Sequence, residues 1–477
     1  MKPSPQHPIR VLQFGEGNFL RCFVDWMIDI MNKKDVFDGK VVIIQPIKDG
    51  KVDILNNQNG KYNVYLRGTK NGIELNERYY IESVIKGINP YSDFHEMLDE
   101  IKNPDLRFII SNTTEAGIAY DPLDSIKHEP PVSFPGKLTL LLFHRFRHFN
   151  GDLNKGFILF PCELIDNNAD KLKDIVLLLI DKWELGADFK NWVLKANIFC
   201  NTLVDRIVPG YPQEREQLII DELGYEDKLA VEGEYFHSWI IEGPPEVADE
   251  FPAPKAGLNV LFVNDLSPYK IRKVRILNGI HTIITPIAYL MNIDTVYDAV
   301  NHPVIKQFVN NTIDIEIIPN LPSQVQDVIN FSNDVLIRFG NPLIKHYLLK
   351  ISLNSISKFE ARVLPSLLEH YQKNKELPKN IVFSLSCLLL FYKGSRNGVP
   401  IELNDDEHVL SFFAKKWKEL DDGIISLKKF VNETLSNTFF WKRDLTKIEG
   451  LEDSICIHIE HINKYGIEFI LETLIKK

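Results

Sequence analysis

The sequence predicts an α/β domain with a parallel-rich sheet, followed by a mostly α-helical domain. In the first half of the 477 residues, short runs rich in β-branched residues alternate with amphipathic stretches, which is typical of βαβ units. From about residue 261 onward, apolar residues recur with helical spacing. A stretch rich in proline and glycine, residues 242–257, separates the two patterns. We therefore expect domains over 1–258 and 259–477.

The predicted elements of the first domain alternate between strand and helix. Residues 10–14 have the pattern of a strand, 20–31 that of an amphipathic helix, and 40–45 that of a second strand rich in β-branched residues. Short apolar runs at 106–111 and 156–160 are further candidates for buried strands. Strands that are apolar throughout are typical of a parallel sheet covered on both faces.

The second domain is predicted to consist of helices separated by turn signals such as Gly340-Asn341-Pro342. The apolar spacing predicts helices over 272–291, 323–339, 342–351, 359–373, 379–393, 406–418, 424–435 and 464–476.

The bulk composition argues against several classes of protein. The hydrophobic share of 44% supplies enough apolar residues for sizeable cores. No stretch approaches the roughly 20 apolar residues of a membrane span. The net charge of -10 argues against a nucleic-acid surface. The five cysteines form no CxxC pair, and the N-terminus lacks the apolar stretch of a secretory signal. We expect a cytoplasmic protein that binds neither membrane nor nucleic acid.

A glycine-containing turn joins the first predicted strand to the first helix. Gly15 permits a tight turn, and Gly17 lets the backbone approach a phosphate near the helix amides. Leu20 occupies the place of the third small residue of a GxGxxG motif, so an ordinary βα turn stays an alternative. The following strand completes a unit of the size that binds a dinucleotide, which favours a Rossmann-type domain.

The end of the second strand is where a residue that binds the adenosine ribose is expected. An acidic residue is usual there, but this chain has Gln45, and Asp49 comes later. Gln45 can hydrogen-bond a ribose hydroxyl, whereas Lys48 can meet the 2′-phosphate of NADP. We favour NAD, and the residues at this strand end leave NADP as an alternative.

A strongly apolar helix, predicted over 272–291, carries three polar residues suited to catalysis. At about 100° per residue, Lys273, His281 and Asn278 lie near 0°, 80° and 140°, on one side of it. Burial lowers the pKa of a lysine ammonium, so that it can exchange a proton near neutral pH. An asparagine amide can stabilise a developing alkoxide, and a histidine can orient the substrate. A lysine and a histidine paired for structural reasons are the alternative.

Two pairs of histidines have a spacing that metal ligands also use. They are His144 with His148 and His458 with His461. Neither pair has a third ligand nearby in the sequence, so solvated helix faces are the better interpretation. We predict no metal site.

Motifs spread over most of the chain occur in the order found in one enzyme family. They are Gly15-x-Gly17-x-Phe19-x-Arg21, Asn112–Gly117, Asn201–Pro209 and Lys273-x4-Asn278-x2-His281. Together they make the chain resemble the mannitol dehydrogenase family of polyol-specific long-chain dehydrogenases. Within that family, further phrases resemble members that interconvert a keto-uronate and an aldonate in hexuronate breakdown. These phrases are Ser133–Thr139, Pro161–Ile165 and Leu353–Lys358.

The resemblance implies a metal-independent oxidoreductase that uses NAD and a small sugar acid. Lys273 would be the general acid/base, Asn278 would help form the oxyanion site, and His281 would orient the substrate or the lysine. A second oxyanion asparagine is carried over onto Asn168, although Ala169 stands where the family motif has a glycine.

The resemblance also implies binding residues. Those for the cofactor are Phe14, Gly15, Gly17, Asn18, Phe19, Arg21, Gln45, Thr114 and Glu115. Those for the substrate are Asp205, Arg206, Lys358 and Arg362. Since a sugar acid carries a carboxylate, its site should contain a cation. The candidates are Lys350, Lys358 and Arg362.

The same motifs fit family members that act on fructuronate, mannitol or mannitol 1-phosphate, because substrate stereochemistry depends on where hydroxyl ligands lie in space. Two further classes remain as hypotheses. One is a non-catalytic nucleotide-binding protein that keeps the glycine turn. The other is a helical interaction module in the second half.

Overall fold

The chain folds into two compact units. The computed structural model describes residues 7–70, 73–113, 117–322, 327–343 and 345–476. The first unit ends at Leu266 and the second begins at Ser267. The proline- and glycine-rich stretch lies inside the first unit, where it joins two neighbouring strands of one sheet. The boundary therefore follows that sheet and comes later than residue 258.

The first unit contains both strands and helices. Its strands are β1 (Ile9–Phe14), β2 (Lys40–Ile44), β3 (Tyr62–Lys70), β4 (Ile73–Ile81), β5 (Val84–Ile88), β6 (Phe108–Ser111), β7 (Ile158–Pro161), β8 (Ile198–Phe199), β9 (Asn201–Asp205), β10 (Val231–Glu234), β11 (Ser238–Glu242) and β12 (Val260–Val263). Its helices are α1 (Asn18–Lys33), α2 (Val52–Asn57), α3 (Phe94–Glu100), α4 (Phe134–His148), α5 (Asn168–Lys182), α6 (Ala187–Ala196), α7 (Glu216–Leu223) and α8 (Glu246–Glu250).

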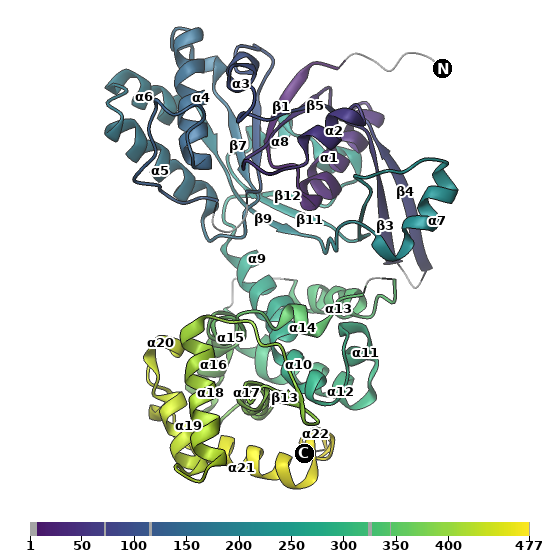
Figure 1. Ribbon diagram of the computed structural model, residues 1–477, viewed down its shortest axis with the longest axis vertical. Coiled ribbons are helices and arrows are strands. Elements are labelled where there is room, and N and C mark those ends of the chain that lie inside the picture. Colours follow the sequence, from purple (N-terminus) through teal and green to yellow (C-terminus); the bar gives the residue numbers. More distant parts are fainter. Residues whose placement is uncertain (1–6, 71–72, 114–116, 323–326, 344, 477) are drawn as a thin grey trace. The chain divides into compact units, whose positions relative to one another are not determined.

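The main sheet of the first unit is parallel, as the sequence predicts. In the described residues it has six strands in the order β5-β2-β1-β6-β7-β8. Helices α4, α5 and α6 lie on one side of it and α1 on the other (Figure 1). The four strands predicted from apolar runs are β1, β2, β6 and β7. The chain reverses its direction of progress through the sheet between β1 and β6. A parallel sheet binds ligands beyond the carboxyl ends of its strands at such a point.

The strands of this sheet bury both of their faces. Val11, Val41 and Ile43 point into a core that includes α1. Leu12 and Phe14, which alternate with them, point into a second core that includes α3, α4, α5 and α6. Burial on both faces explains why these strands are apolar throughout.

Two smaller sheets of the first unit were not predicted. Their orders are β10-β3-β4 and β12-β11-β9. In β4, exposed residues alternate with half-buried ones, so the strand lacks a continuous apolar run. Its position is set by pairing with β3, which is a contact that the local sequence does not encode.

The second unit is mostly helical. Its helices are α9 (Ser267–Arg272), α10 (Gly279–Leu290), α11 (Val296–Asn301), α12 (Pro303–Asn311), α13 (Val328–Phe339), α14 (Leu348–Ile351), α15 (Ser355–Arg362), α16 (Leu364–Asn374), α17 (Lys379–Phe391), α18 (Glu407–Asp421), α19 (Leu427–Leu435), α20 (Thr438–Trp441), α21 (Leu451–Tyr465) and α22 (Ile467–Ile475), with a short hairpin of β13 (Ser395–Arg396) and β14 (Val399–Pro400).

Helix α10 runs through the core of the second unit and packs against α17, which is buried from Asn380 to Phe391. The helix predicted over 359–373 is two helices, α15 and α16, since Pro365 in the first turn of α16 cannot continue a preceding helix. The helix predicted over 342–351 is reduced to α14. Helix α21 and the short helices α11 and α12 were not predicted.

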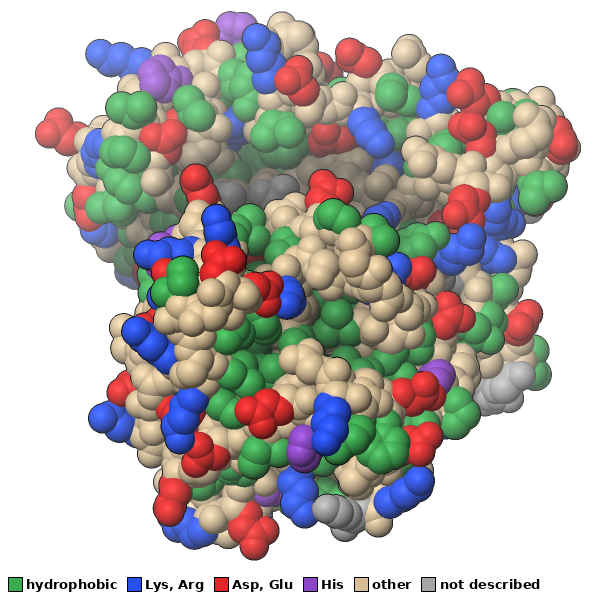
Figure 2. Space-filling model, turned by 60° about the horizontal axis from the view of Figure 1, so that its bottom comes forward, with side chains coloured by type: hydrophobic (Ala, Val, Ile, Leu, Met, Phe, Trp, Pro, Cys, Tyr) green, Lys and Arg blue, Asp and Glu red, His purple; other side chains and the backbone are tan. Residues whose placement is uncertain are grey.

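The surface carries charges of both signs. On the face drawn in Figure 2, basic and acidic side chains are interspersed, and the chain as a whole is acidic. Among the helices of the described ranges, none has the length and apolar character that a membrane crossing needs.

Candidate functional site

The glycine turn lies between the ends of three strands. Gly15 has a φ of +119°, and a Cβ placed on it would lie 2.8 Å from the carbonyl oxygen of Asn112, just after β6. Its N–H donates to the carbonyl of Ile44, the last residue of β2, at 3.1 Å. Only glycine fits this backbone conformation and this close approach.

The second glycine of the turn leaves the start of α1 open. Gly17 is the N-cap of α1, and no side chain of the described residues caps the helix there. A Cβ on Gly17 would meet no described heavy atom within 4 Å. Backbone N–H groups at an uncapped helix start are suited to a phosphate. The turn therefore fits the pyrophosphate of a dinucleotide.

Arg21, predicted to bind the cofactor, supports the turn from inside the protein. It is 1% exposed. Its Nε donates to the carbonyl of Glu16 at 3.0 Å, and its terminal nitrogens donate to the Leu229 carbonyl and to Oδ1 of Asn18, the latter at 2.6 Å. These bonds hold the backbone that faces the phosphate site, so Arg21 positions the turn.

The two phenylalanines of the predicted cofactor set are packed against other rings. The ring of Phe14 is fully buried and lies 4.9 Å from that of Phe134. Phe19 is half-buried and stacks on Phe23 at 4.9 Å. Their side chains pack around the turn. Because the ring of Phe14 is buried, the predicted contact of Phe14 with a cofactor can involve only its backbone.

Gln45 closes the loop that follows β2. Its Nε2 donates to the carbonyls of Ile47 and Lys48, both at 2.9 Å, and its Oε1 accepts from the N–H of Val52 at 3.3 Å. It is 2% exposed. The amide that was expected to bind ribose is engaged by the protein's own backbone. Thr114 and Glu115 lie outside the described residues.

The predicted catalytic helix contains a π-helical segment, Lys273–Asn278, between α9 and α10. The N–H of Gly279 bonds to the carbonyl of Val274, five residues earlier. In this wider turn the residue five positions on lies one turn further along the same face. Asn278 therefore follows Lys273 on one face, and the 140° separation expected from ordinary helix geometry is wrong.

The burial of this helix increases along its length. Lys273 and Asn278 are half-buried, whereas His281 is 6% exposed. The expectation of a helix buried throughout therefore holds for α10 but not for the π-helical segment. Both α13 and α15 contact the π-helical segment. A Cβ on Gly279 would lie 3.5 Å from the carbonyl oxygen of Arg362, so the end of α15 approaches it closely.

His281 is a neutral imidazole held between two rings. It stacks on Phe339 with ring centres 4.1 Å apart and meets the edge of His346 at 5.0 Å. Burial first, and then nearby positive groups, hold the pKa of His281 well below its usual value. Among the described residues, neither Nε2 of His281 nor Nδ1 of His346 has a hydrogen-bond partner.

Positive side chains from α13 and α15 lie close enough to affect the pKa of His281. Arg338, Arg362 and Lys358 each disfavour its protonation. Arg338 is 8% exposed and lies at the end of α13. Lys358 donates to the carbonyl of Ile351 at 2.9 Å. We call Arg338, Lys358 and Arg362 the cationic cluster.

Arg338 and His346 were not predicted as site residues, because a basic residue near a helix end has no sequence pattern of its own. Lys358 and Arg362, which were predicted, lie in the cationic cluster. Lys350, the third candidate cation, is exposed and lies over the ring of Tyr347 at 5.7 Å. Its charge helps to lower the pKa of His346 to about 4, after the larger effect of burial.

Asn168 is used by the backbone of the first unit. Its Nδ2 donates to the carbonyls of Pro161, Glu163 and Thr202 at 2.9, 3.1 and 3.2 Å. It is 1% exposed. Both amide hydrogens have partners here, so this geometry does not support the predicted oxyanion role. The reason is local: Asn168 begins α5 and ties it to the end of β7 and the start of β9.

Arg206 is likewise internal. It is 6% exposed, and its nitrogens donate to the carbonyls of Phe236, Cys22 and Tyr235. Its guanidinium also lies 4.2 Å from the ring centre of Trp26. This arrangement gives Arg206 a structural role and does not support substrate binding. Asp205 is 9% exposed at the end of β9.

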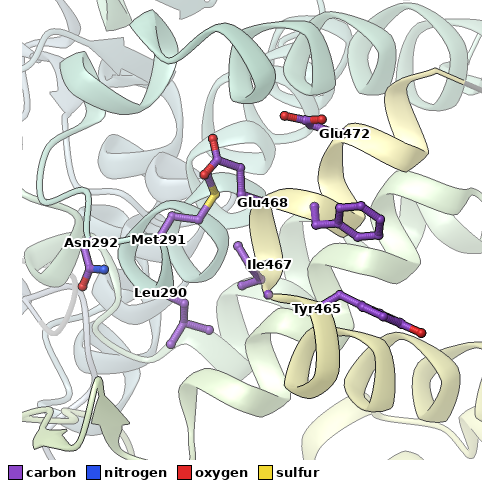
Figure 3. A pocket seen from close by; sticks show the side chains of 9 residues that line it. Leu290, Met291, Asn292, Tyr465, Ile467, Glu468 and Glu472 are labelled. Atoms are coloured by element: carbon purple, nitrogen blue, oxygen red, sulfur yellow. The ribbon is translucent and has the colours of Figure 1, made fainter.

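A cavity of the second unit lies away from the predicted catalytic residues. It measures about 500 Å³ and is formed by the end of α10 and the start of α22 (Figure 3). It is lined by Leu290, Met291, Asn292, Tyr465, Gly466, Ile467, Glu468, Phe469 and Glu472. None of the predicted site residues lines it. In the part of the chain that the structure describes, no group of three or more histidine, cysteine or acidic residues is arranged to hold a metal ion.

Comparison with known proteins gives a consistent result along the chain. The mannitol dehydrogenase Rossmann domain matches residues 9–254, and the mannitol dehydrogenase C-terminal domain matches residues 265–463. An altronate oxidoreductase of Bacillus subtilis (strain 168) is 44% identical over 98% of this chain and 95% of its own length. One of Bacteroides thetaiotaomicron is also 44% identical, over 99% of this chain and 97% of its own length.

Solved structures share the fold. Mannitol 2-dehydrogenase of Pseudomonas fluorescens, solved with NAD and D-mannitol, aligns with a TM-score of 0.75 at 21% identity, over 99% of this chain and 95% of that one. A D-sorbitol dehydrogenase aligns with a TM-score of 0.79 at 18% identity, over 97% of both chains. The two family domains together cover most of the sequence, and the chain belongs to the mannitol dehydrogenase family.

Proposed function

We propose that this protein is an NAD-dependent altronate oxidoreductase, which reduces tagaturonate to altronate and catalyses the reverse reaction. Two altronate oxidoreductases that are 44% identical to this protein over nearly the whole chain support this assignment. The observation that carries the sugar-acid part is the cationic cluster around the neutral His281. Positive side chains near the substrate stabilise a carboxylate more than an uncharged polyol.

The first unit is the part that would hold NAD. The turn fits the pyrophosphate because Gly15 allows a sharp bend and Gly17 leaves the amides of α1 open. When bound, the nicotinamide supplies or accepts the hydride. The protein's own contribution in this unit is to fix the turn through Arg21 and to close the loop after β2 through Gln45.

The second unit supplies the groups for proton transfer and substrate orientation. In the direction of reduction, Lys273 donates a proton to the oxygen of the reacting carbonyl, and in oxidation it removes the proton from the alcohol. Asn278, one π-helical turn further on, donates an amide hydrogen to the same oxygen as charge develops. His281 remains neutral and hydrogen-bonds a substrate hydroxyl, because its Nε2 has no partner among the described residues.

A substrate panel tests this proposal. NADH oxidation is followed with tagaturonate, fructuronate and the neutral ketose fructose. We expect the highest kcat/KM with tagaturonate. A preference for fructuronate would move the protein to a different specificity within its family, and equal activity with fructose would contradict a sugar-acid site.

A variant of the cationic cluster tests the role of charge. Arg338→Leu should raise the KM for tagaturonate by about tenfold or more, because a hydrogen bond to a charged group is lost, while activity with a neutral ketose changes less. Arg443→Gln, an exposed arginine of the same unit, is the matched control. If both variants behave like the wild type, the cluster does not bind the carboxylate.

A further inference from the structure

The end of β2 lacks the acidic residue that is usual in a dinucleotide site, but a carboxylate of the glycine turn lies beside it. The ribose-binding acid of a dinucleotide site normally ends the second strand. In this protein that position is Gln45, and its amide is engaged by the loop backbone. Glu16, between the two glycines of the turn, is only 8% exposed.

The backbone places Glu16 beside the end of β2. The N–H of Gly15 donates to the carbonyl of Ile44 at 3.1 Å, and Glu16 is the next residue. The N–H of Lys51, in the loop after β2, donates to Oε1 of Glu16 at 3.2 Å. A Cβ on Gly50 would lie 2.3 Å from the same oxygen. The loop is therefore packed directly on this carboxylate.

The charged groups that act on Glu16 are positive. Burial raises its pKa, while its own backbone N–H, that of Lys51 and the charges of Arg21 and Lys51 lower it. Lys48 and Lys51 are exposed and bring positive charge to the same loop. The preference between NAD and NADP therefore depends on whether the carboxylate of Glu16 or one of these lysines lies closer to the ribose.

We infer that Glu16 recognises the adenosine ribose and makes the protein prefer NAD to NADP. A carboxylate held at the end of β2 accepts hydrogen bonds from the ribose hydroxyls. The same negative charge repels the 2′-phosphate of NADP. The carboxylate of Glu16 is held in place by the loop, whereas the side chains of Lys48 and Lys51 are exposed. This inference rests on the proposed use of a nicotinamide dinucleotide.

Direct binding measurements test the inference without relying on turnover. The dissociation constants of NADH and NADPH are measured by quenching of protein fluorescence for the wild type and for Glu16→Gln. The glutamine keeps an oxygen that accepts from Lys51, so the loop should stay folded, and its thermal midpoint checks this. We expect the variant to bind NADH about tenfold more weakly and NADPH more tightly, so that the wild-type preference for NADH is lost.

Two further variants separate charge from position. Glu16→Asp keeps the charge with a shorter side chain and should retain a preference for NADH. Asp49→Asn removes the same charge from an exposed residue of the same loop and should leave both constants unchanged.

An unchanged ratio of the two constants in a folded Glu16→Gln protein would overturn the inference. So would a wild type that prefers NADPH and loses that preference in Lys48→Ala. A wild type that binds neither nucleotide would instead contradict the proposed function.

Discussion

Asn168 and Thr202 exchange two hydrogen bonds. The N–H of Thr202 donates to Oδ1 of Asn168 at 3.0 Å, and Nδ2 of Asn168 donates back to the Thr202 carbonyl at 3.2 Å. The same side chain also bonds Pro161 at the end of β7. One buried amide thus joins two strand ends and the start of α5.

Replacement of Asn168 should affect stability more than chemistry. Asn168→Ala removes the hydrogen bonds that this amide makes with the backbone of Pro161, Glu163 and Thr202. The Pro161 carbonyl keeps the hydroxyl of Thr202 as a donor, and each buried group left unpaired costs about 1–3 kcal/mol. We expect a clearly lower denaturant midpoint and a kcat within about tenfold of the wild type. A normal midpoint combined with a kcat loss of about 10²-fold or more would restore the oxyanion role.

The two glycines of the turn should respond differently to alanine. Gly15→Ala forces a Cβ to 2.8 Å from the Asn112 carbonyl at a φ of +119°, so the thermal midpoint should fall. Gly17→Ala meets no described atom within 4 Å, so the midpoint should stay near that of the wild type. The new methyl would occupy the space of the pyrophosphate, and the dissociation constant of NADH should rise. Normal NADH binding by a folded Gly17→Ala protein would argue against a phosphate site at the start of α1.

Lys273 should be needed for proton transfer and dispensable for folding. Lys273→Ala should lower kcat by about 10²- to 10⁴-fold, the usual contribution of a general acid/base. Its side chain is half-buried, so the thermal midpoint should change little, and NADH binding should be retained. Lys270→Ala, one residue of the same helical stretch, is the matched control. Near-normal turnover of a folded Lys273→Ala enzyme would reject the proposed mechanism.

His346 should make the protein less stable in mild acid. Burial, with smaller effects from Lys350 and Arg338, lowers its pKa in the folded state to about 4 from 6.5. Between these values the unfolded chain binds a proton that the folded protein does not, so the free energy of unfolding falls as the pH drops from 6.5 to 4. In His346→Gln this part of the pH dependence should disappear.

Urea unfolding at several pH values between 4.5 and 7.5 measures this difference. Two buried acids, Asp25 and Glu316, have pKa values raised to about 7 and give a slope of the opposite sign. They are present in both proteins, so the comparison of wild type with variant removes their effect. His128→Gln, which replaces an exposed histidine, controls for the loss of a histidine. Parallel curves for wild type and His346→Gln would contradict the prediction.

Local patterns were sufficient for the parts of the fold that have a strong periodicity. The four apolar runs predicted as strands became β1, β2, β6 and β7 of one parallel sheet, because strands buried on both faces are apolar at every position. Strand β4 was missed since one of its faces is exposed and its pairing with β3 is a non-local contact. The separation of α15 from α16 has a local cause, the helix break at Pro365, which the helix predicted over 359–373 did not take into account.

The sequence by itself determined the glycine turn after β1, the Lys273, Asn278 and His281 set on one helix, and the family. These features depend on residue type and on short spacings, which a single chain displays directly. Only the tertiary structure decided how the helix winds between Lys273 and Asn278 and which side chains bond to backbone.

Only the tertiary structure also brought Arg338 of α13, and Lys358 and Arg362 of α15, near His281. It likewise turned Arg206 inward to backbone carbonyls and placed Glu16 against the loop that follows β2. The physical reason is the same for each. Hydrogen-bond satisfaction and electrostatic neighbourhood are set by segments far apart in the chain, and no local pattern of residues specifies them.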